Sequence, residues 1–327
     1  MRPLLDARPD PRTRLAGRPV ERAALFVRLL ASSRLVLDAD ASTRALLRDA
    51  LPSERARWDG KPLGVISVRR DDPDAGPAPE LTPTMRVSGI STWVDVPAPG
   101  LSLVRNERGS VQGSVDRGAR RASLRVGPDL TSDERADAGV ALGIAVTLLA
   151  GHVGHCVVHA GAVIPPGGAA WLLVGDAHSG KSTTTAALAA AGWDYLSDDS
   201  VMLSPLPRER VLVEGWRRGF RLDGVAIADD TLAGGAWRSS APLAGVLFPV
   251  VRADERTRLE PIRRSDAFAA LVRQSPWLLA DRGSSPQCAS LLAHATEMPC
   301  ARLVLGRDSH RRGARLAEVL AGIIAPA

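Results

Sequence analysis

Residues 174–188 read VGDAHSGKSTTTAAL. It contains the pattern G-x-x-x-x-G-K-[ST], whose fixed positions are Gly175, Gly180, Lys181 and Ser182. An apolar run, WLLV, precedes the pattern, and an alanine-rich segment of helical composition follows it. In this context the pattern predicts a loop whose backbone N–H groups wrap phosphate oxygens at the N-terminus of a helix. We refer to residues 175–182 as the phosphate loop.

Lys181 is one of only two lysines in a chain with 40 arginines. A compact ammonium group fits inside a tight backbone curl, whereas the planar guanidinium group of arginine is too broad. We therefore expect Lys181 to reach the β- and γ-phosphates of ATP, and Ser182 to supply an oxygen ligand to Mg²⁺. The residues expected to bind the nucleotide are Gly175, Asp176, Ala177, His178, Ser179, Gly180, Lys181, Ser182 and Thr183.

A pair of carboxylates follows in the segment DYLSDDSV, where an apolar run delivers Asp198 and Asp199 just beyond a short strand. Adjacent side chains point to opposite sides of an extended backbone, so one carboxylate can face the metal and nucleotide while the other fixes the loop or accepts a proton. We expect Asp198 to bind the metal together with Ser182, and both aspartates to belong to the catalytic group with Lys181. A solvated turn is the structural alternative.

Three histidines and a cysteine lie close together in GHVGHCVVHAG, residues 151–161. A zinc site is disfavoured, because His152 suits the dipole of a preceding helix end and His155 lies on the strand face opposite Cys156. His159 differs from the others, since its strand is expected to pair through a tight turn with the strand that enters the phosphate loop. We therefore expect His159 to contact the phosphate site.

The sequence pattern divides the chain into three parts. Residues 1–19 combine charges and prolines and are predicted to form a disordered arm. Residues 20–130, with a predicted helix at 20–30, show short alternating runs separated by turn-rich segments, which predicts a mostly antiparallel β (α+β) domain for an accessory or substrate-recognition role. Residues 131–327 alternate strands and helices, as an α/β domain does, and form the predicted P-loop domain.

The longest apolar run, at 138–151, spans about 14 residues and falls short of the roughly 20 needed to cross a bilayer. It is predicted to be a buried helix that begins at a capping box of Thr131 and Glu134 and ends at Gly151 in the left-handed conformation. The N-terminal segment lacks an apolar signal core, and the three cysteines form no CxxC pair, so no disulfide framework is expected. These features favour a cytoplasmic location without a membrane partner.

The formal net charge of +6 does not by itself predict a nucleic-acid partner. Basic residues are spread along the chain among 36 acidic ones, and aromatic residues make up only 4% of the composition, too few for a base-stacking surface. We therefore expect no nucleic-acid binding.

The stretch VVHAGAV…WLLVGDAHSGKSTTTAALAAAGWDYLSDDSVML resembles the catalytic domain of HPr kinase/phosphorylase, and particularly its diverged relatives, the serine kinases that accompany peptide-modifying operons. The resemblance covers residues 155–203 well and the C-terminal third loosely, whereas the first 150 residues match no motif of the family. It implies a nucleotide-binding domain of the HPr kinase/PEP carboxykinase type. It also favours a homo-oligomer, because relatives of the family assemble as oligomers.

The same resemblance implies ATP-dependent phosphorylation of a serine hydroxyl on a peptide or small protein. It places His159, Asp198 and Asp199 at the family's catalytic positions, with one aspartate as the general base, and Lys181 at the phosphates. One departure from the family is Thr183, which stands where the family has glutamate.

Other functions and residues stay open at this stage. The chain could be a nucleotide-binding regulatory ATPase that transfers no phosphate, or a small-molecule kinase, since a P-loop does not distinguish a peptide serine from a metabolite alcohol. Arginines in GWRRGFRL could stabilise phosphate charge or form a solvated basic face. They are Arg217, Arg218 and Arg221.

Overall fold

The structure is a computed structural model that describes residues 25–27, 35–47, 62–71, 78–215, 220–222, 225–227, 234–308 and 316–320. The predicted arm at 1–19 lies outside these ranges, as do Arg217 and Arg218. Of Arg221 only the backbone is described, in the short strand β15 (Phe220–Leu222), which pairs with β16 (Val225–Ile227).

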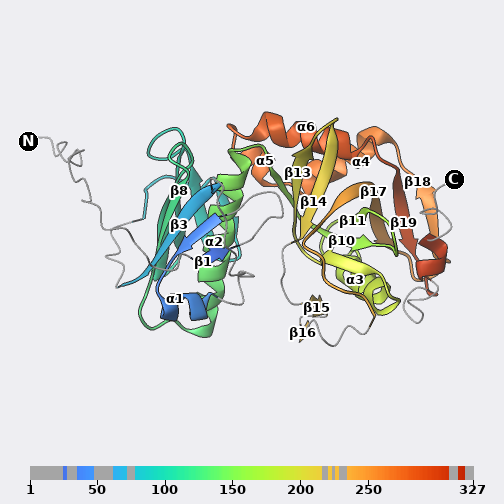
Figure 1. Ribbon diagram of the computed structural model, residues 1–327, viewed down its shortest axis with the longest axis horizontal. Coiled ribbons are helices and arrows are strands. Elements are labelled where there is room, and N and C mark those ends of the chain that lie inside the picture. Colours follow the sequence, from blue (N-terminus) through green and yellow to red (C-terminus); the bar gives the residue numbers. More distant parts are fainter. Residues whose placement is uncertain are drawn as a thin grey trace, which may run out of the picture.

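The described strands build two large sheets that stand side by side (Figure 1). The first sheet has eight strands in the order β1-β2-β3-β8-β7-β6-β5-β4. Its pairings are antiparallel except for β2 with β3 and β3 with β8. Its strands are β1 (Leu25–Val27), β2 (Leu35–Asp38), β3 (Gly64–Arg70), β4 (Met85–Val87), β5 (Ile90–Val94), β6 (Leu101–Asn106), β7 (Val111–Asp116) and β8 (Arg121–Val126).

The beginning of this sheet corrects one prediction. Residues 25–27, expected within a helix at 20–30, form β1 and pair antiparallel with β2. Pairing with a neighbouring strand outweighs a local helical pattern that is only a weak prior. A helix, α1 (Ala41–Leu46), follows β2, and the side chain of Asp40 accepts the backbone N–H of Thr43 at 2.8 Å at its N-terminus.

The helix α2 (Ser132–Gly151) confirms the predicted capping box. The Thr131 hydroxyl accepts the backbone N–H of Glu134 at 3.3 Å, and the Glu134 carboxylate accepts the backbone N–H of Thr131 at 2.9 Å. The predicted end is wrong in detail, because Gly151 is still helical and the left-handed glycine after the helix is Gly154, with φ of 92°. No helix in the described ranges has the length and apolar character needed to span a membrane.

The helix α2 packs on β6, β7 and β8, and its apolar residues join the core of the first sheet. The buried residues of α2 that belong to this core extend from Ala138 to Ala150. The hydrophobic pattern identified the helix but not the sheet that it covers.

The second sheet has nine strands, of which seven follow the order β12-β10-β11-β17-β14-β13-β9, while β19 pairs with β17 and β18. Its strands are β9 (Cys156–Val158), β10 (Ala160–Ile164), β11 (Ala170–Val174), β12 (Asp194–Ser197), β13 (Val201–Leu206), β14 (Arg210–Gly215), β17 (Ser240–Val251), β18 (Arg258–Pro261) and β19 (Cys300–Leu305). Strands β11, β17 and β19 run parallel, so their C-terminal ends all lie on the same side of the sheet, at the ends of the strands.

Helices cover both faces of the second sheet (Figure 1). One face packs against α3 (Lys181–Ala190), whose Leu188 is fully buried. The other face packs against α4 (Arg264–Arg273) and α6 (Ser285–Ala295), close to the short α5 (Trp277–Ala280). The second unit is therefore a three-layer α/β structure, and together with the first sheet the molecule is a mixed α/β protein.

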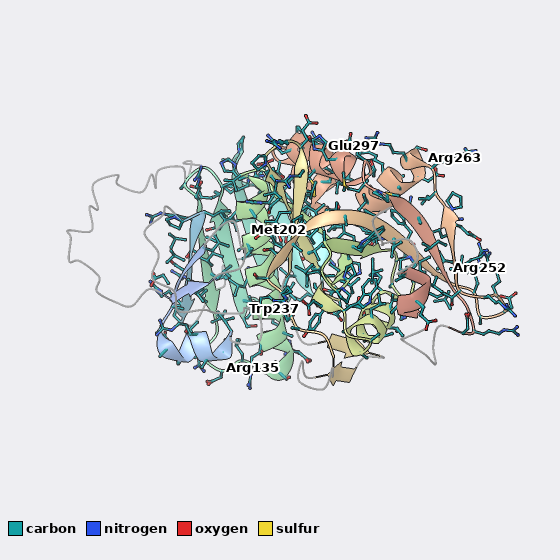
Figure 2. All side chains as sticks on the ribbon, turned by 45° about the vertical axis from the view of Figure 1, so that its right-hand side comes forward. Arg135, Met202, Trp237, Arg252, Arg263 and Glu297 are labelled. Carbon is teal, nitrogen blue, oxygen red and sulfur yellow. A yellow bond between two sulfur atoms is a disulfide. The ribbon has the colours of Figure 1, made fainter. Side chains whose placement is uncertain are left out.

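A buried ion-pair group joins the two units. Arg117, between β7 and β8, is 4% exposed and pairs with both Asp95 and Asp281, the latter directly after α5 and only 1% exposed. Met202 on β13 packs into the core of the first unit, at the junction where Figure 2 labels it. The interface between the units thus contains both apolar packing and paired charges.

Candidate phosphate-binding site

The phosphate loop connects β11 to α3 at the edge where the parallel strands end. Gly180 adopts the left-handed conformation with φ of 96° at the N-cap of α3, and His178 has φ of 62°. A Cβ atom at Gly180 would lie 2.6 Å from Cδ1 of Leu305, so glycine is required by both conformation and space. Backbone N–H groups in such a turn, followed by a helix N-terminus, form a concave site that suits an anion.

The side chain of Lys181 turns back over this loop. Its ammonium group donates hydrogen bonds to the backbone carbonyls of Gly175 at 2.7 Å and Asp176 at 2.9 Å, and the residue is 6% exposed. Burial lowers the pKa of Lys181, while the carboxylates of Asp199 and Asp176 act in the opposite direction. The ammonium group is therefore held inside the loop by neutral carbonyls that a phosphate oxygen can replace.

The environment of the Ser179 hydroxyl bears on whether an anion fits the loop. Its Oγ atom is buried and makes no hydrogen bond to any described residue. A Cβ atom placed on Gly175 would lie 2.7 Å from this Oγ, which locates the hydroxyl within the curl of the loop. A buried donor without a partner costs free energy. A phosphate oxygen in the curl would satisfy it, so the residues present fit the phosphate groups of a nucleotide.

Ser182 and Asp198, which the sequence predicts to share a metal site, are in contact through the backbone of Asp198. The Ser182 hydroxyl is 3.5 Å from the backbone carbonyl of Asp198, and Asp198 is 5% exposed. A hydroxyl and a carboxylate are the hard oxygen ligands that Mg²⁺ takes from proteins, beside water and phosphate. The described residues contain no group of three or more His, Cys, Asp or Glu side chains placed to hold a metal. Thr183, at the family's glutamate position, is exposed.

His159 and Asp199 form a pair beside the phosphate loop. The Nδ1 atom of His159 lies 3.3 Å from Oδ1 of Asp199, and the side chains are 40% and 47% exposed. Ser200 donates its hydroxyl to the other carboxylate oxygen at 3.0 Å. The predicted single strand through His159 is broken there into β9 and β10, and β10 pairs with β11, which enters the loop. His159 itself lies in neither strand, so the expectation that it lies on the strand paired with that of the loop is wrong; the paired strand, β10, begins at the next residue.

The other members of the histidine and cysteine cluster point elsewhere. His152 caps the end of α2, and buried His155 donates from Nδ1 to Ser204 at 2.6 Å, while Ser204 donates to Glu214. Burial lowers the pKa of His155, with the Glu214 carboxylate acting in the opposite direction.

The cysteines correct an expectation. Cys156 on β9 forms a disulfide with Cys288 on α6, 132 residues away, although the sequence predicted no disulfide framework. Cys300 is the free cysteine. The spacing along the chain concealed this pair, because its members belong to a sheet and to the helix packed on it.

One residue of the site was missed by sequence reasoning. Gln274, at the C-terminal end of α4, donates its side-chain amide to Oδ1 of Asp176 at 2.6 Å. Its backbone carbonyl accepts the N–H of His159 at 2.8 Å. No motif surrounds Gln274, so nothing local identified it. The remaining loop residues, Ala177 and His178, are exposed.

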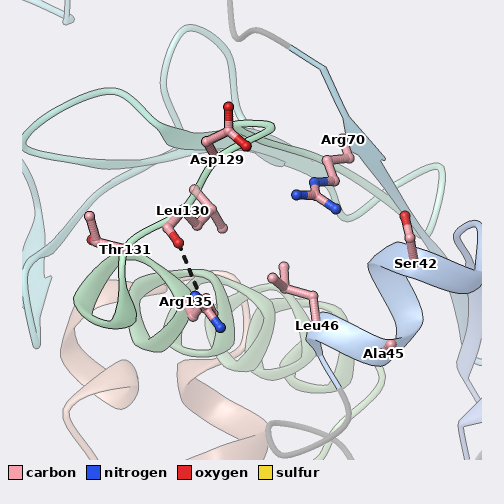
Figure 3. A pocket seen from close by; sticks show the side chains of 8 residues that line it. All are labelled: Ser42, Ala45, Leu46, Arg70, Asp129, Leu130, Thr131 and Arg135. Atoms are coloured by element: carbon pink, nitrogen blue, oxygen red, sulfur yellow. Dashed lines mark hydrogen bonds between the residues drawn. The ribbon is translucent and has the colours of Figure 1, made fainter.

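A hollow of about 570 Å³ lies in the first unit, away from the phosphate loop (Figure 3). Its lining comes from α1, Arg70 on β3, and the beginning of α2, where Arg135 donates to the backbone carbonyl of Leu130 at 3.3 Å. The residues that carry candidate chemistry lie in the second unit, so this hollow is not part of the candidate site.

Comparisons with known proteins add little to this geometry. No model of a known protein family matches the chain, and no curated protein matches it in sequence. Among solved structures, the Hpr(Ser) kinase/phosphatase from Coxiella burnetii is 13% identical, with a TM-score of 0.31, over 51% of this chain and 95% of that chain. This likeness indicates a distant relationship at most, and the function has to be argued from the residues themselves.

Proposed function

We propose that the protein is an ATP-dependent kinase that transfers the γ-phosphate to a serine hydroxyl of a peptide or small protein. The observation that carries the proposal is the position of Asp199, which pairs with His159 at 3.3 Å and lies close enough to Lys181 to affect its pKa. A phosphate-binding ammonium group and an accessible carboxylate therefore share one site.

A protein catalyses phosphoryl transfer mainly by positioning the reactants and by neutralising the charge of the phosphate groups. In this proposal the backbone N–H groups of the phosphate loop and the ammonium group of Lys181 hold the nucleotide phosphates. Ser182 and Asp198 hold Mg²⁺, which when bound neutralises phosphate charge. Asp198 suits this role because it is buried beside Ser182.

Asp199 is the general base in this proposal. Its side chain is 47% exposed, so an acceptor hydroxyl can reach it, whereas Asp198 is buried. The serine oxygen forms a bond to the γ-phosphorus, the bond from that phosphorus to the bridging oxygen of ADP breaks, and the serine proton passes to Asp199. His159 holds the carboxylate in place from the end of β9.

The test is transfer of label from γ-labelled ATP with Mg²⁺ to an extract of the native cells, followed by separation of labelled polypeptides from small solutes. We expect label on a serine residue of a polypeptide. Label on small solutes instead would make the chain a small-molecule kinase, and nucleotide binding without any labelled acceptor would make it a regulatory protein; either result overturns the proposal.

Two variants identify the source of the activity. Asp199→Asn should lower transfer by about 10²- to 10⁴-fold, the range for loss of a general base, while leaving nucleotide binding intact. Asp133→Asn, an equivalent change at an exposed aspartate on α2, is the matched control and should keep full activity. Equal activity of the Asp199 variant and the control would remove Asp199 from the proposed role.

A further inference from the structure

Gln274 makes two contacts that reach different parts of the candidate site. Its side-chain amide donates to the Asp176 carboxylate at 2.6 Å, and its backbone carbonyl accepts the N–H of His159 at 2.8 Å. The residue is 9% exposed and follows the last turn of α4. Gln274, at the end of α4, thus contacts both the phosphate loop and the backbone of His159, whose side chain pairs with Asp199.

The contact with Asp176 bears directly on the shape of the phosphate loop. The backbone carbonyl of Asp176 accepts the Lys181 ammonium group at 2.9 Å and the N–H of Ser179 at 3.2 Å. A change in the backbone torsions of Asp176 would therefore move groups that would surround a phosphate. The side chain of Asp176 is also an anion beside an anion-binding loop, and the amide of Gln274 fixes where that charge lies.

We propose that Gln274 is a positioning residue for nucleotide binding and phosphoryl transfer: it fixes Asp176 in the phosphate loop and sets the loop's distance from the His159–Asp199 pair. This inference rests on the proposed function, since it assigns a role within the same site. A hydrogen bond to a charged group contributes enough that its loss should weaken nucleotide binding by about 10- to 100-fold.

The decisive variant is Gln274→Glu, which keeps the size of the side chain but places a carboxylate against the carboxylate of Asp176. We expect this variant to bind MgADP about 10- to 100-fold more weakly than the wild type in calorimetry. Gln287→Glu, the same substitution at an exposed position on α6, is the matched control and should bind as the wild type does.

A donor swap separates positioning from a general structural effect. In the double variant Asp176→Asn with Gln274→Glu, the amide and the carboxylate exchange places, so the new amide at position 176 can donate to the new carboxylate at position 274 across the same gap. We expect the swap to recover most of the affinity lost in Gln274→Glu. We also expect kcat to recover, because the position of the loop relative to Asp199 returns.

Gln274→Asn provides a second variant in case Gln274→Glu does not fold. It retains the amide chemistry but is one methylene shorter and cannot span the contact of 2.6 Å. It should therefore raise the Kd for MgADP and lower kcat, with an unchanged melting temperature. Wild-type affinity and kcat in both Gln274→Asn and Gln274→Glu, or failure of the swap to restore binding, would overturn the assignment.

The experiment also distinguishes failure of this inference from failure of the proposed function. If the wild type itself binds no MgADP, the phosphate loop does not bind a nucleotide and the proposed function falls with the inference. If the wild type binds MgADP and every Gln274 variant binds it equally well, only the role of Gln274 is lost.

Discussion

The Nδ1 atom of His159 lies 3.3 Å from the Oδ1 atom of Asp199, which links the break between β9 and β10 to the turn between β12 and β13. The two side chains are 40% and 47% exposed. The strands are interrupted at His159, whose backbone N–H donates to the carbonyl of Gln274.

His159→Ala should lower kcat by about 10- to 100-fold and leave the Kd for MgADP unchanged, because in the proposed mechanism the imidazole contacts the general base and not the nucleotide. In the background of Asp199→Asn the same change should have little further effect, since residues that act as a unit are not additive. Single-turnover rates of the two single variants and the double variant check this. Full multiplication of the two effects would show that His159 acts independently of Asp199.

The capping box of α2 should make the stability of the first unit depend on pH. Hydrogen bonds from the backbone N–H of Thr131 and the hydroxyls of Ser110 and Thr131 lower the pKa of Glu134 from 4.5 to about 2. Because the folded-state pKa is lowered, this stabilisation is complete above about pH 4.5 and is lost as the pH falls towards 2.

Urea unfolding of Glu134→Gln between pH 5 and pH 2 measures this contribution. The variant should lose less stability than the wild type as the pH falls, because it lacks the carboxylate whose protonation is penalised. Asp133→Asn, at an exposed carboxylate of the same helical turn, should follow the wild type. Parallel pH curves for Glu134→Gln and the wild type would contradict the role of the capping box.

The ion pair of Arg117 and Asp281 should stabilise the contact between the two units. Asp281→Ala should lower the free energy of unfolding by about 3–5 kcal/mol, because it leaves a buried guanidinium group without one of its partners. Asp95→Ala should cost less, since Asp95 is 38% exposed. Denaturant unfolding measures both changes. An equal loss of unfolding free energy in the two variants would contradict the expectation that the buried Asp281 contributes more than Asp95.

The parts of the structure that local sequence could predict are those fixed by neighbours in the chain. The phosphate loop, the capping box and the aspartate pair all depend on residues a few positions apart. Contacts between distant segments could not be predicted in this way: Gln274 meets Asp176 across 98 residues and Arg117 meets Asp281 across 164. Which sheet α2 would cover likewise depended on tertiary packing that no local pattern encodes.

The disulfide between Cys156 and Cys288 should lower the number of thiols that a reagent can titrate. Unfolded without reductant, the chain should show one reactive thiol, from Cys300, and after reduction it should show all three. In the folded protein Cys300 should react slowly, because burial raises the pKa of its thiol to about 11. Titration with a thiol reagent checks these counts, and three thiols in the unreduced chain would contradict the disulfide.

The phosphate loop and Lys181 are proposed to bind the phosphate groups of a nucleotide, and isothermal calorimetry with MgATP measures that binding. The wild type and Lys61→Met, which changes the only other lysine, should bind MgATP equally, whereas Lys181→Met should bind about 10- to 100-fold more weakly. No binding to the wild type, or equal binding by Lys181→Met, would contradict the claim.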